Sequence, residues 1–168
     1  DLTYQIGALT AFTSNNKLQH VKPHGAMYNK AVVDANLARA ICQSVLNVDP
    51  EMIIVALAGS EWVGIAEGMG LRVAREAFAD RAVRSDGTLV PRSEPGAVIH
   101  DVGSVVERSV KMITENKVIA ITGEELIIHA DSICLHGDTP GALDIAKGVK
   151  AGLEKAGVEI KPMMDVVS

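Results

Sequence analysis

The chain has 168 residues, of which 48% are hydrophobic and 22% charged, a balance typical of one globular domain with a substantial core. Its net charge of -5, without a basic run, argues against binding to a nucleic-acid backbone. An aromatic content of 3% also disfavours stacking on single-stranded bases. We therefore expect no nucleic-acid partner.

The sequence contains no apolar run long enough to span a bilayer, and we recognise no secretory leader, so we expect no membrane partner. The two cysteines, Cys42 and Cys134, lie far apart in apolar settings. This arrangement is typical of buried thiols in a reducing compartment. The sequence therefore predicts a cytoplasmic protein without a disulfide.

Helices and strands alternate in the first half of the chain. Asp34 is suited to cap a helix, and the uninterrupted apolar run at 52–58 is typical of a parallel strand covered on both faces. Ser60 is expected to start the helix that follows this strand. The predicted elements of this half are a helix over 2–13, a strand over 18–22, a helix over 34–47, a strand over 52–58, a helix over 61–69 and a strand over 71–78.

The second half opens with a long polar connection over residues 82–97, which contains two prolines and two glycines. Connections of this length are usually functional or disordered. Asp101 is expected to cap the next helix, and Thr139 and Pro140 to form the cap and first turn of a later one. The predicted elements of this half are a helix over 102–115, antiparallel strands over 118–121 and 126–129, a strand over 132–135, a helix over 140–156 and a strand over 158–160.

This alternation predicts an α/β fold with a mainly parallel sheet and right-handed crossovers. The pattern by itself leaves open whether the sheet is a barrel or an open, doubly wound sheet. Neither a Gly-x-Gly-x-x-Gly sequence nor a Walker A sequence occurs, so no familiar loop cradles a nucleotide.

Three of the predicted strands end in ionisable residues. At the first of these ends, Pro23 cannot donate to a sheet ladder and Gly25 permits a sharp turn. Because the carboxyl ends of parallel strands share one edge, we expect the polar side chains at these ends to converge on one rim. The residues are Lys22 and His24 at one end, Glu76, Asp80 and Arg81 at another, and His136 and Asp138 at a third.

Such a rim suits general acid-base chemistry on a small polar substrate, since it offers imidazoles, carboxylates and cations together. Arg92, beside Pro91 on the long loop, is a candidate to clamp a carboxylate through two parallel hydrogen bonds.

Each candidate has a structural alternative. A histidine at a strand end is often a structural residue with satisfied hydrogen bonds. Glu76 is equally well explained by an ion pair with Arg72, Arg75 or Arg81. Asp138 is equally explained as a turn former ahead of Pro140.

A bound metal is an open question at this point. His24, His136, Asp80 and Asp138 are permitted ligand types, but they come from separate strands and show no close-spaced ligand motif.

Four sequence blocks, in the same order and covering nearly the whole chain, resemble a known family. They are Val-Lys-Pro-His-Gly-Ala-Met-Tyr-Asn (21–29), Glu-Ala-Phe-Ala-Asp-Arg (76–81), Asp-Gly-Thr-Leu-Val-Pro-Arg (86–92) and Cys-Leu-His-Gly-Asp-Thr-Pro (134–140). None is a generic pattern. Together they resemble the LamB/YcsF family, which includes the A subunits of bacterial ATP-dependent 5-oxoprolinases.

The resemblance implies an irregular seven-stranded β/α barrel like that of the polysaccharide deacetylases. It also implies cleavage of 5-oxoproline (pyroglutamate) to L-glutamate, driven by ATP with Mg²⁺ as its counter-ion, together with partner subunits B and C. Eight residues match the family blocks by position. We assign His24, His136, Asp138 and Asp80 to catalysis, and Lys22, Glu76, Arg81 and Arg92 to substrate binding. Among these, His136, oriented by Asp138, is our first candidate for the base.

Family members usually begin with a further portion of roughly a third of the chain, which we do not recognise here. We therefore expect residues 1–168 to form a single β/α domain, the C-terminal two thirds of a family barrel that lacks its N-terminal strands. An opened barrel exposes an edge and apolar surface, so we also expect association between copies. Two alternative functions remain: a metal-dependent carbohydrate deacetylase-like hydrolase, and a non-catalytic partner subunit.

Overall fold

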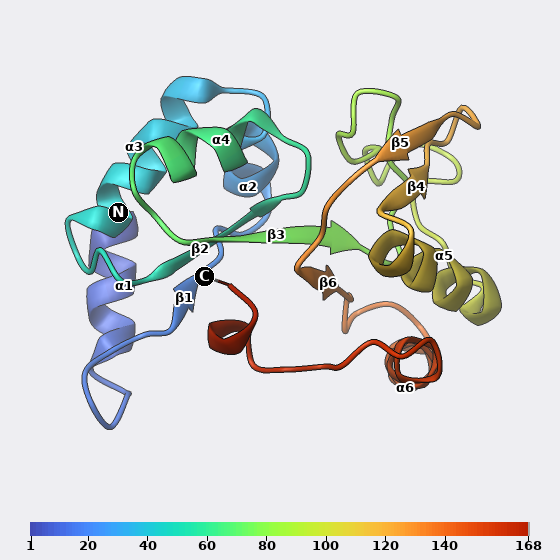
Figure 1. Ribbon diagram of the computed structural model, residues 1–168. Helices are drawn as coiled ribbons and strands as arrows, with labels where there is room; N and C mark the ends of the chain where they lie inside the picture. The colour runs from blue at the N-terminus through green and yellow to red at the C-terminus, as the bar shows by residue number, and fades with distance from the viewer. Residues whose placement is uncertain (168) are drawn as a thin grey trace. The chain divides into compact units, whose positions relative to one another are not determined.

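The computed structural model of this chain describes residues 1–167 (Figure 1). These residues fall into two compact units, the first made of residues 1–75 and the C-terminal residues from 163 onward, the second of residues 76–162. The expectation of one β/α domain stays a prediction. Among the described residues, no helix is both long and apolar enough to cross a bilayer.

The first unit places helices around two parallel strands, β1 (His20–Val21) and β2 (Ile53–Leu57). His20 lies opposite Ile53 and Val21 opposite Ile54. Every residue of β2 is buried, as the uninterrupted apolar run predicted. The remaining elements of this unit are α1 (Leu2–Thr10), α2 (Ala26–Ala31), α3 (Ala35–Leu46), α4 (Glu61–Gly68) and the 3-10 helix η1 (Met163–Asp165).

Two helix starts in the first unit can be compared with their predicted caps. The Asp34 carboxylate accepts the backbone N–H groups of Asn36 and Leu37, both at 3.1 Å, so the predicted cap of α3 is confirmed. Ser60 does precede α4, but its hydroxyl donates to the Leu57 carbonyl at 2.7 Å and does not cap the helix.

Helix α2 was not predicted. Gly25 precedes it with a φ of 62°, which confirms that a glycine makes the turn after β1. The chain then enters a helix, where a loop was expected. Only six residues long, α2 buries just Tyr28 and Ala31, which is too little for an apolar period to show in the sequence.

In the second unit, two parallel strands pack against two long helices. Strand β3 (Val73–Phe78) begins in the first unit and ends in the second, where it pairs in parallel with β6 (Ser132–Cys134). The other elements are α5 (Val102–Thr114), β4 (Lys117–Ile119), β5 (Glu125–Ile127) and α6 (Ala142–Lys155). Strands β4 and β5 pair in antiparallel fashion, as predicted. The α/β class and the parallel pairing are confirmed, whereas the seven-stranded deacetylase-like barrel stays a prediction.

Two expectations about the last third of the chain were wrong. Helix α6 begins at Ala142, and its N-cap is Gly141 in the left-handed region, so Thr139 does not cap it. Residues 158–160 do not form a strand. The Val158 N–H instead donates to the Leu153 carbonyl at 3.0 Å and closes the end of α6.

The two helices of the second unit pack closely because α6 presents glycines to α5 (Figure 1). A Cβ added to Gly152 would lie 2.7 Å from Val106 Cγ1, and one added to Gly148 would lie 2.9 Å from Val106 Cγ2. Real Cβ atoms do not approach other carbons this closely. The absence of side chains at Gly148 and Gly152 therefore sets the separation of α5 and α6.

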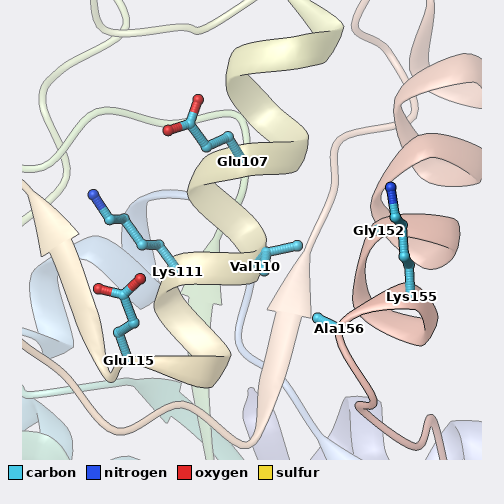
Figure 2. A pocket seen from close by; sticks show the side chains of 7 residues that line it. All are labelled: Glu107, Val110, Lys111, Glu115, Gly152, Lys155 and Ala156. Atoms are coloured by element: carbon cyan, nitrogen blue, oxygen red, sulfur yellow. The ribbon is translucent and has the colours of Figure 1, made fainter.

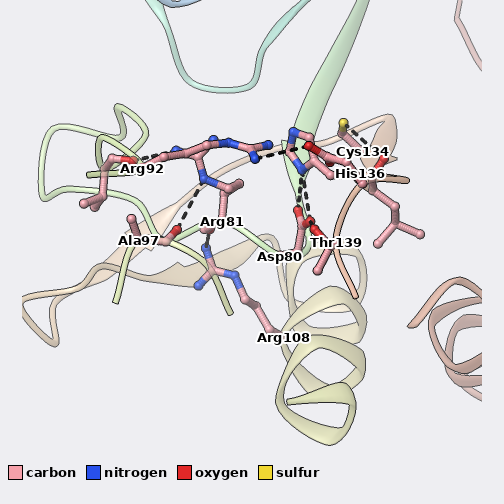
Figure 3. A network of polar contacts seen from close by, with 11 residues as sticks. Asp80, Arg81, Arg92, Ala97, Arg108, Cys134, His136 and Thr139 are labelled. Atoms are coloured by element: carbon pink, nitrogen blue, oxygen red, sulfur yellow. Dashed lines mark hydrogen bonds and ion pairs between the residues drawn. The ribbon is translucent and has the colours of Figure 1, made fainter. Parts of the chain in front are cut away.

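The polar connection over 82–97 is held within the second unit by the buried side chain of Arg81, which the half-buried Arg108 supports (Figure 3). Arg81 Nη2 donates to the Val90 carbonyl at 2.6 Å and Nε to the Ala97 carbonyl at 3.3 Å. Arg108, on α5, donates in turn to the Arg81 carbonyl at 2.9 Å. Burial lowers the pKa of Arg108 to about 10, so its guanidinium stays charged at neutral pH. The two arginines fix a loop that the sequence marked only as irregular.

We expect Gly152→Ala to lower the free energy of unfolding by about 1–2 kcal/mol, because the new methyl group would overlap Val106, and overpacking outweighs the gain in helix propensity. Denaturant unfolding measures this change. Gly64→Ala in α4 is the matched control, since a Cβ there meets nothing within 4 Å, and it should stabilise. Adding Val106→Ala to Gly152→Ala should restore part of the loss. Equal effects at the two glycines would contradict this packing.

We expect Arg81→Lys to loosen the loop, because an ammonium cannot bridge two carbonyls as the planar guanidinium does. Losing even one charged hydrogen bond, worth about 1.5–3 kcal/mol, should speed amide hydrogen exchange at Ala82 and Val90 by about tenfold or more. Arg84→Lys is the control, since Arg84 forms an exposed pair with Glu94 on the same loop. Unchanged exchange in Arg81→Lys would show that the clamp does not fix the loop.

Candidate functional site

One face of the β3–β6 pair carries a row of polar and aromatic side chains. Alternate residues of a strand point to opposite faces, and paired residues of parallel strands share a face. Ala77 and Ile133 are on the face that packs in the core with the helices. The opposite face carries Glu76, Phe78 and Asp80 from β3 and its extension, and Ser132, Cys134 and His136 from β6 and its extension; we call these six residues the polar row.

The polar row ends in a hydrogen-bonded pair, Asp80 and His136 (Figure 3). The pairing of the strands continues past Phe78, since the Ala79 N–H donates to the Cys134 carbonyl at 3.1 Å. His136 Nδ1 lies 2.8 Å from Asp80 Oδ1 and 3.0 Å from Oδ2. The Phe78 ring stacks on the imidazole with centroids 5.7 Å apart and planes at 21°. His136 is thus held on its edge by a carboxylate and on one face by an aromatic ring.

The environment of Asp80 determines what His136 can do. Asp80 is 1% exposed, so its carboxylate is almost entirely removed from water. A carboxylate only accepts hydrogen bonds, so Nδ1 is the nitrogen that donates. The neutral imidazole then keeps its lone pair on Nε2, the nitrogen that can accept a proton. The pair has the arrangement of a general base and the carboxylate that orients it.

The prediction that Asp138 orients His136 was wrong, because Asp80 takes that position. Asp138 is 72% exposed at its side chain and lies 3.6 Å from Arg92 Nη1. His136 and Asp138 share a tight turn, in which the Thr139 N–H donates to the His136 carbonyl at 3.4 Å. Asp80, by contrast, comes from the neighbouring strand at the same level as His136. Cross-strand neighbours of this kind lie within side-chain reach of one another.

The two predicted arginines of this region differ in their surroundings. Burial, and next the positive charge of Arg92, lower the pKa of Arg81, so the two guanidinium groups lie near each other. Arg81 uses Nε and Nη2 on loop carbonyls. The Arg92 side chain is 49% exposed. Among the ion pairs described, it takes part only in the long contact with the exposed Asp138. Arg92 is therefore better placed than Arg81 to meet an anion from solvent.

Glu76 lies at the other end of the polar row. It is 5% exposed and sits opposite Ser132, whose buried hydroxyl has no hydrogen-bond partner in residues 1–167. Phe78 separates Glu76 from Asp80 along the strand, so the two carboxylates are not neighbours. A role of Glu76 in substrate binding, and its alternative as a structural ion pair, both stay predictions.

Lys22 and His24 belong to the first unit. Lys22 Nζ lies 5.7 Å from the centroid of the Tyr28 ring, a distance typical of a cation–π contact. His24 is exposed and directly precedes the turn at Gly25. The expected convergence of these two residues with Asp80 and His136 stays a prediction.

A surface groove of the second unit lies away from the polar row. This groove, of about 460 Å³, runs between α5 and α6 and contains none of the predicted site residues (Figure 2). Its walls mix charged and small apolar side chains. They are Glu107, Val110, Lys111, Glu115, Gly152, Lys155 and Ala156.

Possible metal ligands and the two cysteine thiols can also be located in the structure. No group of three or more His, Cys, Asp or Glu side chains within residues 1–167 is arranged to hold a metal ion. Cys42 is buried and Cys134 half-buried, and both are thiols. Burial raises the pKa of Cys42, which makes it a poor nucleophile.

Comparison with known proteins agrees with this fold. The chain is 52% identical over 162 residues to the A subunit of 5-oxoprolinase from Clostridium beijerinckii, covering 95% of this chain and 64% of that protein. It is 49% identical over 168 residues to the protein of the same name from Pyrococcus furiosus, covering 99% and 66%. The crystal structure of a lactam utilization protein from Thermus thermophilus matches with a TM-score of 0.86 and 44% identity, covering 96% of this chain and 65% of that one.

The chain thus spans just under two thirds of the length of these relatives. The LamB/YcsF family profile matches residues 1–168, the entire sequence. This chain belongs to the LamB/YcsF family.

Proposed function

We propose that this chain is part of the A subunit of a 5-oxoprolinase, which cleaves 5-oxoproline to L-glutamate at the expense of ATP, in the cytoplasm and together with subunits B and C. The names of its relatives support the reaction class. The observation that carries the proposal is the hydrogen bond between the half-buried His136 and the buried Asp80, because lactam hydrolysis needs a base that activates water.

In the proposed reaction, ATP phosphorylates the lactam oxygen and makes the ring carbon electrophilic. His136 Nε2 accepts a proton from a water molecule as its oxygen bonds to that carbon. The imidazolium is stabilised by Asp80 through Nδ1–H, and it returns the proton to the ring nitrogen as the carbon–nitrogen bond breaks. A second water then releases phosphate from the acyl phosphate, which leaves glutamate.

Arg92 is proposed to bind the carboxylate of 5-oxoproline. Its guanidinium is half-exposed, lies close to the charged Arg81 and has a long contact of 3.6 Å to Asp138. Exposed pairs of this kind contribute at most about 1 kcal/mol. A substrate carboxylate that makes two parallel hydrogen bonds would therefore replace Asp138 readily. In this proposal Asp138 keeps Arg92 in place before substrate binds.

ATP and its Mg²⁺ are assigned to no residue of this chain. The sequence has no familiar phosphate-binding loop. The partner subunits, or the part of the relatives that this chain does not match, are proposed to supply nucleotide binding.

We expect His136→Ala to lower glutamate formation by about 10²–10⁴-fold, because a general base contributes about that much to a rate. The assay combines the intact protein with subunits B and C, ATP and 5-oxoproline. His129→Ala is the matched control, since His129 is exposed and lies outside the polar row.

Three outcomes of this assay would contradict the proposal. Absence of glutamate from the parent complex would reject the reaction. Activity of His136→Ala equal to that of the parent would reject the base. Loss of complex assembly in His136→Ala, without a change in turnover per assembled complex, would favour a non-catalytic role.

We expect Arg92→Ala to raise the KM for 5-oxoproline by about 10–100-fold with a smaller change in kcat, since it removes a charged hydrogen bond worth about 1.5–3 kcal/mol. Steady-state kinetics measures both constants. Arg84→Ala, on the same loop and in a similarly exposed ion pair, should leave KM unchanged. An equal rise in KM for both variants would indicate a loss of overall positive charge and would reject a specific clamp.

A further inference from the structure

Thr139 is buried within a stretch that is otherwise exposed. It is 8% exposed, whereas its neighbours Asp138 and Pro140 lie at the surface. Two successive turns produce this placement. The Thr139 N–H donates to the His136 carbonyl at 3.4 Å, and the Ala142 N–H donates to the Thr139 carbonyl at 3.0 Å. The turns direct the Thr139 side chain inward, and this side chain does not cap α6.

The Thr139 hydroxyl faces the carboxylate that holds His136 (Figure 3). Thr139 Oγ1 lies 3.4 Å from Asp80 Oδ2 and donates to it, because the carboxylate only accepts. The main chain of Asp80 is fixed separately, since its carbonyl accepts the Ile99 N–H at 2.9 Å. The carboxylate of Asp80 can still rotate about χ2, a torsion whose preferences are intrinsically broad. A second donor on Oδ2 restricts that rotation.

We propose that Thr139 is a positioning residue for the proposed base. By donating to Oδ2, it holds the carboxylate in the orientation in which Oδ1 and Oδ2 lie 2.8 and 3.0 Å from His136 Nδ1, and thereby keeps the lone pair of the neutral imidazole on Nε2. This inference rests on the proposed function for its catalytic meaning. The effect of Thr139 on the tautomer of His136 does not depend on the proposed function.

The test compares Thr139→Val, which keeps the shape and removes the hydroxyl, with Thr139→Ser, which keeps the hydroxyl. Nitrogen-15 NMR of the histidine rings of the intact protein reports which nitrogen carries the proton. The parent and Thr139→Ser should show His136 protonated at Nδ1, and Thr139→Val should show a mixture of tautomers. In the assembled enzyme, kcat should fall about three- to tenfold in Thr139→Val with KM unchanged, and Thr139→Ser should restore it.

Asp80→Asn serves as the reference for an imidazole that has lost its carboxylate. If Thr139→Val fails to fold, judged by circular dichroism, Thr139→Ala removes the hydroxyl without adding a branched apolar group. An unchanged tautomer in a folded variant without the hydroxyl would overturn the inference. If Thr139→Val shifts the tautomer but the parent enzyme forms no glutamate, the proposed function would be rejected and the positioning of His136 would remain established.

Discussion

The site depends on one buried interaction, the contact between the Asp80 carboxylate and His136 Nδ1. Removing a carboxylate from water is costly unless hydrogen-bond donors replace the water. His136 and Thr139 supply those donors at the side chain. The same requirement fixes the orientation of the imidazole. The cost of burying Asp80 is therefore offset only while the ring is held in the geometry that a base needs.

The surroundings of this pair show how the fold keeps it in place. Strands β3 and β6 bring Asp80 and His136 to the same level, and the face behind them is packed against the helices. Arg81 and Arg108 use their guanidinium groups on backbone carbonyls, so they order the loop that carries Arg92. Arg81 and Arg108 thus have structural roles, whereas the half-exposed guanidinium of Arg92 can be reached by an anion from solvent.

Much of the fold followed from local patterns. The cap at Asp34, the buried run of β2, the antiparallel β4–β5 pair and the helix from Val102 are each set by residues close together in the sequence. The errors arose where tertiary contacts outweighed local preference. Gly141 rather than Thr139 begins α6, since the Thr139 side chain is used on Asp80. Residues 158–160 alternate apolar and polar side chains as a strand would, but the Val158 N–H is used to close the end of α6.

The sequence alone determined the α/β class, the family resemblance and the set of polar residues at the strand ends, because these depend on composition, periodicity and contiguous motifs. Only the tertiary structure decided which of those residues meet. Asp138 is two residues from His136 and turns away to solvent, whereas Asp80 is 56 positions distant and forms the hydrogen bond. Strand register sets that choice, and no short turn fixes the register of two strands that lie this far apart in the sequence, so it is decided by how their faces pack in the folded chain.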